Sequence, residues 1–227
     1  MEKLLKALEL YIFPKHCLVC GVNENYICNK CELEIPLMLS YFCLLCGRTC
    51  PNGFIHRKCG NKYTPDRFLA AFEYSGVIKK ALIKAKDKIF DVYTLLVDLA
   101  FEHFEGTGLV IGEDAIIVPL PLKRSEYREK TFDPALLISR LFAKKYGVEV
   151  RQIFIRNGKD RESFKINPVL IGSLKGKDLV LVDDIVDSGE TMLSACRELR
   201  SLGRKGPRYI YCMSLAYSRP GKYKRYT

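Results

Sequence analysis

The stretch LVLVDDIVDSGETM, residues 179–192, decides the fold class of this 227-residue chain. An apolar run leads into the adjacent acids Asp183 and Asp184, then into a short polar loop and a sequence typical of a helix start. A strand made of apolar residues favours a central position in a parallel sheet, because both of its faces are then buried. Ligands of parallel α/β sheets bind beyond the carboxyl ends of the strands, so we expect the two acids at a binding edge.

The loop after the two acids has the chemistry of a phosphate site. Gly189 lets the backbone approach a ligand closely. The free N–H groups of a helix start, with the hydroxyls of Ser188 and Thr191, suit a phosphate group. The acids upstream suit ribose hydroxyls, either directly or through Mg²⁺. An ordinary acidic helix cap is the competing interpretation, but it does not account for two adjacent acids followed by D-S-G-E-T. The sequence therefore predicts a site for a ribose 5-phosphate.

Strands and helices are expected to alternate along the rest of the chain. Apolar patterning predicts strands at 68–74, 115–122, 148–155, 177–184 and 208–217, and helices at 76–87, 91–104, 133–147 and 189–203. Pro134 in the first turn and Gly147 at the end support the bounds of the third helix. Residues 156–165 are expected to form a polar, basic loop. This alternation predicts an α/β fold with a mostly parallel sheet flanked by helices.

Eight of the ten cysteines lie in the first sixty residues. Such clustering favours metal over disulfides, and it predicts a Cys-rich zinc module over residues 1–62, followed by the α/β domain over residues 63–227. The first group forms two C-x2-C knuckles, which together complete a tetrahedral zinc site. Its members are Cys17, Cys20, Cys28 and Cys31.

The second group of cysteines comprises Cys43, Cys46, Cys50 and Cys59. Cys43 and Cys46 form a knuckle, whereas the other ligands stay open: His56 could replace a cysteine, or knuckles could cross-pair between groups. Structural zinc sites are closed by four protein ligands, so we expect structural zinc in one or two sites. A redox pair is disfavoured, because the C-x2-C spacing occurs three times in one segment.

The formal net charge of +11 lies mostly outside the cysteine segment. The segment from Arg197 to Thr227 holds nine Lys or Arg residues against one acid, Glu198. Such a face is either ordinary solvated surface or a binding face for nucleic acid, a phosphorylated metabolite or an anionic membrane. The tyrosines of this segment are either strand residues or platforms for stacked bases. They are Tyr209, Tyr211, Tyr217, Tyr223 and Tyr226.

The sequence also bears on where the protein is found. No apolar run approaches the ~18 residues of a membrane span. The first thirteen residues place apolar side chains at helical spacing and interrupt them with charges, which predicts an amphipathic helix and not an export signal. We therefore expect a cytoplasmic protein.

The string VLVDDIVDSGET resembles the phosphoribosyl-pyrophosphate (PRPP) signature of type I phosphoribosyltransferases. The resemblance implies that Asp183 and Asp184 bind the ribose. It also implies that a loop binds the 5-phosphate, formed by Asp187, Ser188, Gly189, Glu190 and Thr191. In purine-salvage members the acid at the position of Asp187 is a proposed general base, whereas many other members have Thr there. The implied catalytic residues are thus Asp183, Asp184 and Asp187.

In that family an earlier strand leads into a loop for pyrophosphate and Mg²⁺. Its counterpart here is IVPLPLKRSEYREK, residues 117–130, so Leu122 and Lys123 are candidate PRPP contacts. The basic side chains of this loop either neutralise polyphosphate or belong to an ordinary exposed loop. They are Lys123, Arg124, Arg128 and Lys130.

The zinc module followed by this signature resembles the ComF family, the competence-protein relatives of phosphoribosyltransferases. Beyond the C-x2-C pairs, the resemblance rests on F-E-Y-S-G at 72–76, I-K-K-A-L-I-K at 78–84, V-P-L-P at 118–121 and S-F-K at 163–165. The chain departs from the family at KTFDP, residues 130–134, where an Arg-Gly-Phe-Asn-Gln stretch is usual. A segment before S-F-K is also shortened. These departures favour ligand binding over transferase turnover.

The resemblance implies a cytoplasmic role in natural transformation. The first hypothesis is a protein that binds PRPP or a related ribose phosphate together with single-stranded DNA and meets proteins of the DNA-uptake machinery. The alternative is an active phosphoribosyltransferase that joins a nucleobase to PRPP with Mg²⁺ and releases pyrophosphate.

Overall fold

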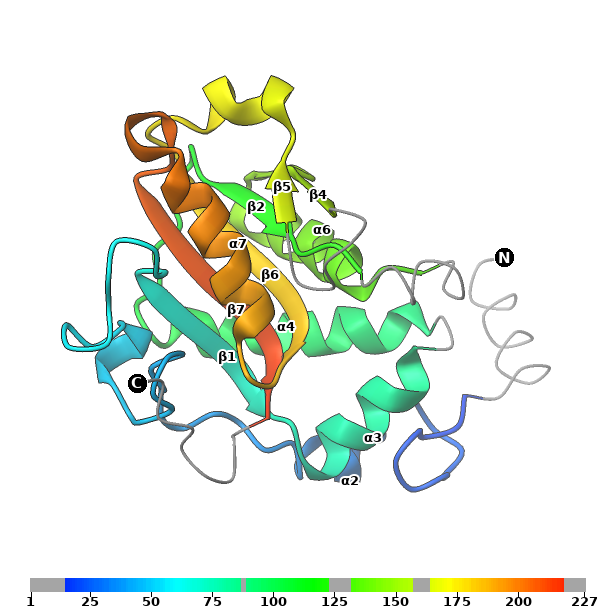
Figure 1. The fold of residues 1–227 in the computed structure, drawn as a ribbon. Helices are drawn as coiled ribbons and strands as arrows, with labels where there is room; N and C mark the ends of the chain where they lie inside the picture. The colour runs from blue at the N-terminus through cyan, green and yellow to red at the C-terminus, as the bar shows by residue number, and fades with distance from the viewer. Residues whose placement is uncertain (1–14, 87–88, 123–131, 157–163, 219–227) are drawn as a thin grey trace.

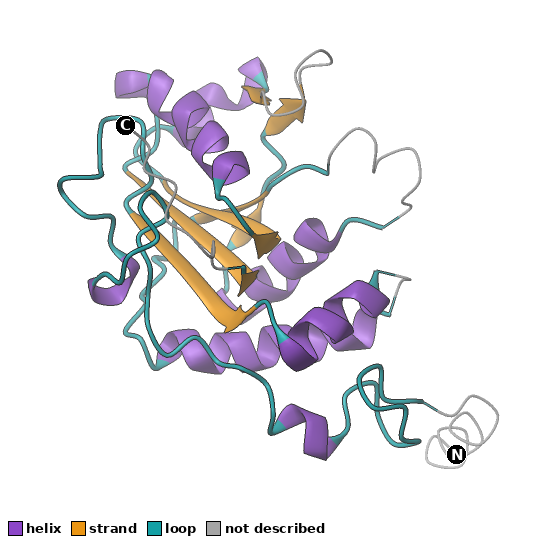
Figure 2. Cartoon of the chain, turned by 60° about the horizontal axis from the view of Figure 1, so that its bottom comes forward, coloured by secondary structure: helices purple, strands orange, loops and turns teal. Residues whose placement is uncertain are grey.

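A five-stranded parallel sheet forms the centre of the protein in a computed structural model, which describes residues 15–86, 89–122, 132–156 and 164–218. The strand order is β1-β7-β6-β2-β3, and every neighbouring pair is parallel. The strands are β1 (Arg67–Glu73), β2 (Ile116–Pro119), β3 (Glu149–Val150), β6 (Asp178–Val186) and β7 (Tyr209–Tyr217). Figure 2 shows their arrowheads directed to one edge. The predicted α/β class is confirmed, and β6 is the middle strand.

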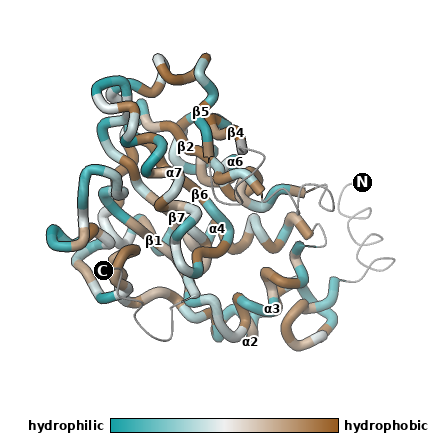
Figure 3. The backbone as a smooth tube through the Cα atoms, viewed as in Figure 1, coloured by the Kyte–Doolittle hydropathy of each residue, from teal (hydrophilic) through white to brown (hydrophobic). Residues whose placement is uncertain are grey.

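Helices cover both faces of the sheet (Figure 1). One face packs against α3 (Gly76–Ala85), α4 (Phe90–Glu105) and α6 (Pro134–Tyr146), and the other against α7 (Glu190–Ser201). Short helices complete the chain: α2 (Asn29–Glu32), η1 (Pro51–Gly53), η2 (Pro168–Leu174) and η3 (Gly203–Lys205). Figure 3 shows hydrophobic and hydrophilic stretches alternating along α4, as expected of a helix with one buried face.

The alternation of side chains along β6 explains this layering. Leu179 and Leu181 belong to the core on the α7 side, whereas Val180 and Val182 belong to the core beneath α3, α4 and α6. Successive side chains of a strand point to opposite faces, so one apolar run serves both cores. All four residues are fully buried.

The predicted bounds of the third helix are confirmed by its caps. Asp133 accepts a 3.0 Å hydrogen bond from the backbone N–H of Leu136, Pro134 occupies the first turn, and Gly147 ends the helix with φ of 69°. Glycine suits such a left-handed end because it has no Cβ atom. The helix expected at the N-terminus lies outside the described residues.

The single strand expected over 148–155 is wrong. The chain leaves the main sheet after β3 and enters a separate antiparallel hairpin formed by β4 (Phe154–Arg156) and β5 (Phe164–Ile166). The reason is burial: Ile153, Phe154, Phe164 and Ile166 add to the core on the α7 side. The polar loop expected over 156–165 is therefore replaced at its ends by strand, and residues 157–163 lie outside the described part.

The cysteine segment lies along the free side of the edge strand β1 (Figure 1). The backbone N–H of Met38 donates to Ala71 O at 2.8 Å, and that of Glu73 donates to Pro36 O at 2.9 Å. Isolated bridges also pair Leu37 with Phe72 and Phe54 with Arg67. This pairing covers polar groups that an edge strand otherwise leaves open. No helix among the described residues is long and apolar enough to cross a membrane.

Candidate functional site

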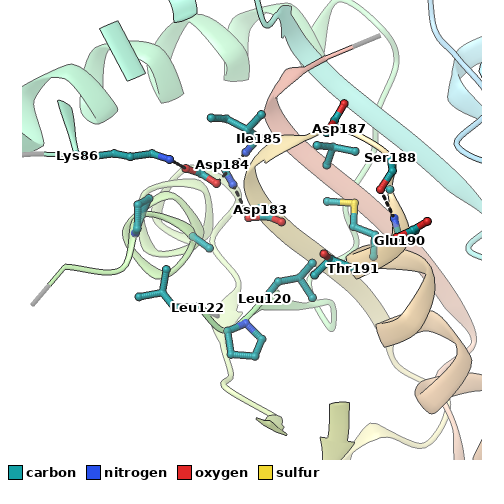
Figure 4. A pocket seen from close by; sticks show the side chains of 16 residues that line it. Lys86, Leu120, Leu122, Asp183, Asp184, Ile185, Asp187, Ser188, Glu190 and Thr191 are labelled. Carbon is teal, nitrogen blue, oxygen red and sulfur yellow. Dashed lines mark hydrogen bonds and ion pairs between the residues drawn. The ribbon is translucent and has the colours of Figure 1, made fainter. Parts of the chain in front are cut away.

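A cavity of about 290 Å³ opens at the carboxyl ends of β2 and β6 (Figure 4). The segment after β2, the start of α6, the end of α3 and the turn between β6 and α7 form its walls. Parallel α/β sheets bind ligands at this edge, and the volume lies near the lower bound typical of small-molecule sites.

The structure brings most of the predicted site residues to this cavity. Those that line it are Asp183, Asp184, Asp187, Ser188, Gly189, Glu190, Thr191 and Leu122. Lys123 and the other basic residues of the predicted pyrophosphate loop, Arg124, Arg128 and Lys130, lie outside the described residues. The site therefore consists of the turn after β6 together with the end of the β2 segment.

The two acids have unequal surroundings. Burial of its carboxyl group raises the pKa of Asp183 well above the usual value, and the negative charge of Asp184 raises it further. Asp184 has a cation nearby, because Lys86 Nζ lies 3.9 Å from its Oδ2 atom. Asp183 therefore keeps its proton to a higher pH than an ordinary aspartate, and a bound cation or a set of hydroxyl donors would favour its charged form.

Backbone groups hold both carboxylates in place. Asp183 Oδ1 accepts a hydrogen bond from the backbone N–H of Asp184, and Asp184 Oδ1 accepts one from the backbone N–H of Ile185, each at 2.9 Å. In each case one oxygen is engaged by the backbone, and the second oxygen of Asp184 is the one that lies 3.9 Å from Lys86 Nζ. Carboxylate oxygens are also the ligands that Mg²⁺ prefers, so this pair fits either a ribose diol or the metal.

The turn between β6 and α7 is the loop in which the sequence predicts a phosphate site. Gly189 has φ of 77° and ψ of 0° and directly precedes the first residue of α7. Asp187 and Ser188 are exposed, and Ser188 Oγ accepts only a long hydrogen bond, 3.4 Å, from the backbone N–H of Glu190. A helix start leaves its first N–H groups without partners inside the helix. The first three residues of α7, Glu190, Thr191 and Met192, line the cavity, so the N–H groups that could bind an anion belong to its lining residues.

Lys86 is the site residue that sequence reasoning missed. It lies just after the last residue of α3, and its side chain is one of the cavity walls in Figure 4. The only signal in the sequence is the lysine-rich string KKALIKAK, residues 79–86. Helical periodicity alone does not show which of its four lysines faces the end of a strand more than ninety residues away, because that depends on how α3 packs.

The first cysteine group could hold a zinc ion. The sulfur atoms of its members lie within 4.8 Å of one another: Cys17, Cys20, Cys28 and Cys31. Cys20 Sγ and Cys28 Sγ are 3.6 Å apart, close to the ~3.8 Å expected for two sulfurs of a tetrahedral zinc with ~2.3 Å bonds. Burial raises the pKa of Cys17, but backbone N–H groups of Cys20 and Cys28 outweigh it and lower the pKa to about 6. The pKa values of Cys28 and Cys31 are raised instead, in Cys31 chiefly by burial, so the four thiols share the cost of one another's negative charge.

The second group that could hold zinc differs from the predicted set. Its ligand atoms lie within 4.8 Å of one another and belong to Cys43, Cys46, His56 and Cys59. His56 Nδ1 is 3.3 Å from Cys46 Sγ, while its Nε2 atom lies 3.0 Å from Thr49 O, which fixes the ring. Cys50 is buried outside this group, and burial raises its pKa to about 11.

The group that contains His56 is the alternative that the sequence analysis left open, and the sequence also holds a signal for it. Cys20 and Cys46, which end the first knuckles of the two groups, are each followed by glycine, and His56-x2-Cys59-Gly60 repeats this pattern with histidine in the first position. The backbone N–H groups of Cys59 and Gly60 both donate to His56 O, at 2.8 and 2.9 Å, and close the turn. The ten cysteines, all within the described residues, form no disulfide.

The comparisons with known proteins agree with this geometry. Residues 135–226 match the model of the phosphoribosyl transferase domain family. The chain is 23% identical to the competence protein ComFC of Bacillus subtilis over 198 residues, which cover 80% of each protein. It is 30% identical to a ribose-phosphate pyrophosphokinase of Ralstonia nicotianae over 127 residues, 52% of this chain and 39% of that protein. The chain thus spans about two fifths of that relative.

Among solved structures, a purine phosphoribosyltransferase from Pyrococcus horikoshii matches with a TM-score of 0.32 and 20% identity, covering 55% of this chain and 81% of that one. The assignment depends instead on the sequence matches and on the geometry of this chain. The sheet and the turn after β6 thus belong largely to a segment that matches the phosphoribosyl transferase domain. Over most of its length the chain is a homologue of ComFC, and its N-terminal segment holds a Cys₄ group that could bind zinc.

The raised pKa of Asp183 predicts a pH-dependent stability. The unfolded carboxyl titrates near pH ~3.9, so its contribution to the free energy of unfolding is complete below that pH and is lost as pH rises through the higher folded pKa. Asp183→Asn has no charge to lose, so we expect a higher melting temperature than wild type at pH 8, with a gain that shrinks toward pH 4. Asp98→Asn is the control: it removes a half-exposed carboxylate of α4 that pairs with Lys145 at 2.8 Å, away from the site, and it should show no such gain. An equal gain at both pH values contradicts the prediction.

The second zinc group predicts different outcomes for two neighbouring substitutions. Metal analysis of the purified protein should give two zinc ions per chain for Cys50→Ser and one for His56→Ala, because only the latter removes a ligand from a group of four. One zinc ion in Cys50→Ser and two in His56→Ala would show instead that Cys50, and not His56, is the ligand.

Proposed function

We propose that this ComF-like protein binds PRPP or a related ribose 5-phosphate at the turn after β6 and single-stranded DNA on a separate basic face, in the cytoplasm, during DNA uptake for natural transformation. The observation that supports the first half is the convergence of the two acids and the turn 187–191 on one open cavity. The DNA half is supported by the exposed charges and by the similarity to ComFC.

In this proposal each part of the cavity contacts one part of the ligand. The 5-phosphate accepts hydrogen bonds from the N–H groups at the start of α7 and from the hydroxyls of Ser188 and Thr191. Asp183 and Asp184 accept from the two ribose hydroxyls. Lys86, which faces Asp184 at 3.9 Å, supplies positive charge for the pyrophosphate. Mg²⁺, where it accompanies PRPP, would be held by the same carboxylates and would neutralise the polyphosphate.

Zinc in this proposal is structural. Each of the two groups offers four protein ligands within 4.8 Å of one another, so neither leaves an open position for a substrate. We propose that the Cys-rich module comprises residues 1–62. Its backbone hydrogen bonds to β1 would stabilise that edge of the sheet.

The proposed DNA face lies at the other end of the sheet. Lys175, Arg204 and Lys205 are exposed around the start of β6 and the end of α7. Along β6, Asp178 at this end is five residues from Asp183 and nine from Asp187, about 17 and 30 Å at ~3.3 Å per residue. A single strand carries negative phosphates and flat bases, so it needs both cations and aromatic rings.

Tyr209 supplies an aromatic ring at this face. It is 46% exposed, stacks on Tyr211 with ring centroids 6.2 Å apart, and has the Arg208 guanidinium 5.7 Å from its own centroid. Tyr217, in contrast, is buried and is a core residue of β7. Two basic residues of the same segment are already engaged in ion pairs, Arg200 with Asp66 and Arg208 with Asp178. Tyr223 and Tyr226 lie outside the described residues.

Ligand binding is tested by thermal unfolding. PRPP with Mg²⁺ at about 100 times its dissociation constant should stabilise the protein by about 2.7 kcal/mol, a shift of about 5–10 °C for a chain of this size. Asp184→Asn and Thr191→Val should lose most of that shift, because they remove a ribose contact and a phosphate contact. Asp98→Asn is again the matched control.

The absence of a shift in the wild-type protein, or the same shift in Asp184→Asn, would refute the proposed site. The same protein should be offered a panel of nucleobases. Pyrophosphate release that Asp184→Asn abolishes would assign transferase turnover in place of binding alone.

The DNA face is tested by charge and ring substitutions. Fluorescence anisotropy with a labelled oligonucleotide should show about 10-fold weaker binding for Tyr209→Leu, in line with ~1–3 kcal/mol per stacked base. Arg204→Glu with Lys205→Glu should weaken binding and flatten its dependence on salt, by a slope of ~0.7 for each phosphate that the protein no longer neutralises. Lys80→Glu with Lys144→Glu makes the same charge change on exposed positions of α3 and α6. If both double variants lose the same affinity for the oligonucleotide, the DNA does not bind specifically at this face.

A further inference from the structure

The second zinc group touches the phosphate turn through one side chain. Leu44 follows the ligand Cys43 in its knuckle and is only 4% exposed. A methyl group added to Gly189 would lie 2.6 Å from Leu44 Cδ1 and 2.9 Å from Leu44 Cγ. These distances mean that the Leu44 side chain lies directly against the backbone of Gly189. The knuckle of the second zinc group and the turn after β6, which are far apart in the sequence, are therefore in direct contact.

The turn depends on neighbours because it contributes little packing of its own. Asp187, Ser188 and Glu190 are exposed, and Gly189 has a left-handed backbone, which costs any residue except glycine about 1–2 kcal/mol. On the strand side the backbone N–H of Ser218 donates to Val186 O at 2.8 Å. On the side of Gly189, Leu44 provides the contact.

The knuckle that carries Leu44 is fixed from both ends. Cys43 is fully buried, its N–H donates to Arg48 O, and its carbonyl accepts from the N–H of Gly47, each at 2.8 Å. Metal at the second group would join Cys43 and Cys46 to the turn formed by His56 and Cys59. Phe42, before the knuckle, lies 6.1 Å from the ring of Tyr217, within the core that also holds Val186 and Met192.

The first group has no such contact. Leu18 holds the position after Cys17 that Leu44 holds after Cys43, but Leu18 packs against the core on the opposite face of the sheet, with α3 and α4. The two groups that could bind zinc thus support different faces, and only the second has a leucine seated on Gly189.

We infer that Leu44 is a positioning residue for the phosphate turn, and that metal at Cys43, Cys46, His56 and Cys59 holds it there, so that affinity for the ribose 5-phosphate depends on the second metal group and not on the first. This inference rests on the proposed function for its ligand. The contact itself predicts a change in the turn that is measurable without ligand.

The test compares Leu44→Ala with Leu18→Ala in the full chain. Hydrogen exchange of the ligand-free protein should show faster exchange at the amides of residues 187–192 in Leu44→Ala and wild-type exchange there in Leu18→Ala. Titration with PRPP and Mg²⁺, followed by thermal shift, should show at least 10-fold weaker binding for Leu44→Ala alone. Both variants should keep the wild-type zinc content, which separates the effect of the leucine from the effect of the metal.

A second pair tests the metal. Cys46→Ser removes a ligand of the second group and Cys20→Ser removes one of the first. We expect Cys46→Ser to lose zinc, to exchange faster at residues 187–192 and to bind PRPP at least 10-fold more weakly. Cys20→Ser should lose zinc with the turn unchanged. If Leu44→Ala does not fold, Leu44→Val should show a smaller increase in exchange at residues 187–192. Leu44→Met, which conserves the volume of the side chain, should exchange there like the wild-type protein.

The outcomes are distinguishable. A wild-type protein that ignores PRPP overturns the proposed function, and the exchange at residues 187–192 still decides the role of Leu44. Wild-type exchange and affinity in Leu44→Ala overturn the positioning role, as do equal effects of Cys46→Ser and Cys20→Ser on the turn.

Discussion

Burial of β6 on both faces is the constraint on which the rest of the structure depends. Leu179 and Leu181 enter one core while Val180 and Val182 enter the other, so over these four residues the strand has no face on which a polar side chain is tolerated. The polar residues of β6 lie on either side of this run: Asp178 pairs with Arg208 at its start, and two acids follow the point where the pairing with β2 ends. The acids Asp183 and Asp184 and the turn to α7 occupy that point, and β2, the neighbouring strand, ends beside them. The position of the site is thus a consequence of the packing of the sheet.

The parts of the molecule that follow from local pattern could be predicted from the sequence, and those that follow from contacts between distant segments could not. The strands β1, β6 and β7 and the four long helices have apolar repeats of the right period over enough residues to be recognised. The segment 148–155 has the composition of one strand, but the burial of Ile153 and Phe154 against the α7 side carries it into a second sheet. The sequence names His56 as an alternative ligand but does not choose between it and Cys50, because that choice depends on which side chain folds back onto Cys43 and Cys46. Lys86 reaches Asp184 only because of the way α3 is packed.

The site is arranged at the expense of local stability. Burial disfavours the charged form of Asp183, and Gly189 is in a backbone conformation that other residues avoid. The two residues before Gly189, Asp187 and Ser188, are exposed. Sites that must accept an anion commonly have such features, because donors already satisfied by the protein are not available to a ligand. The free energy that stabilises the turn must then come from its surroundings, which here are the end of β7 and the knuckle around Leu44.

A metal-bound knuckle suits this task better than an apolar loop of the same length. A segment of about fifty residues buries too little apolar surface to be rigid on its own, and a leucine on a mobile loop would lose conformational entropy each time it met Gly189. Four ligands within 4.8 Å of one another, joined by a metal, would remove that freedom before the contact forms. Only one side chain of the knuckle, Leu44, then has to pack against the core next to Gly189, because the metal would fix the backbone of the knuckle that carries it. On this view the cysteine module is part of the binding site's support as well as a cover for the edge strand β1.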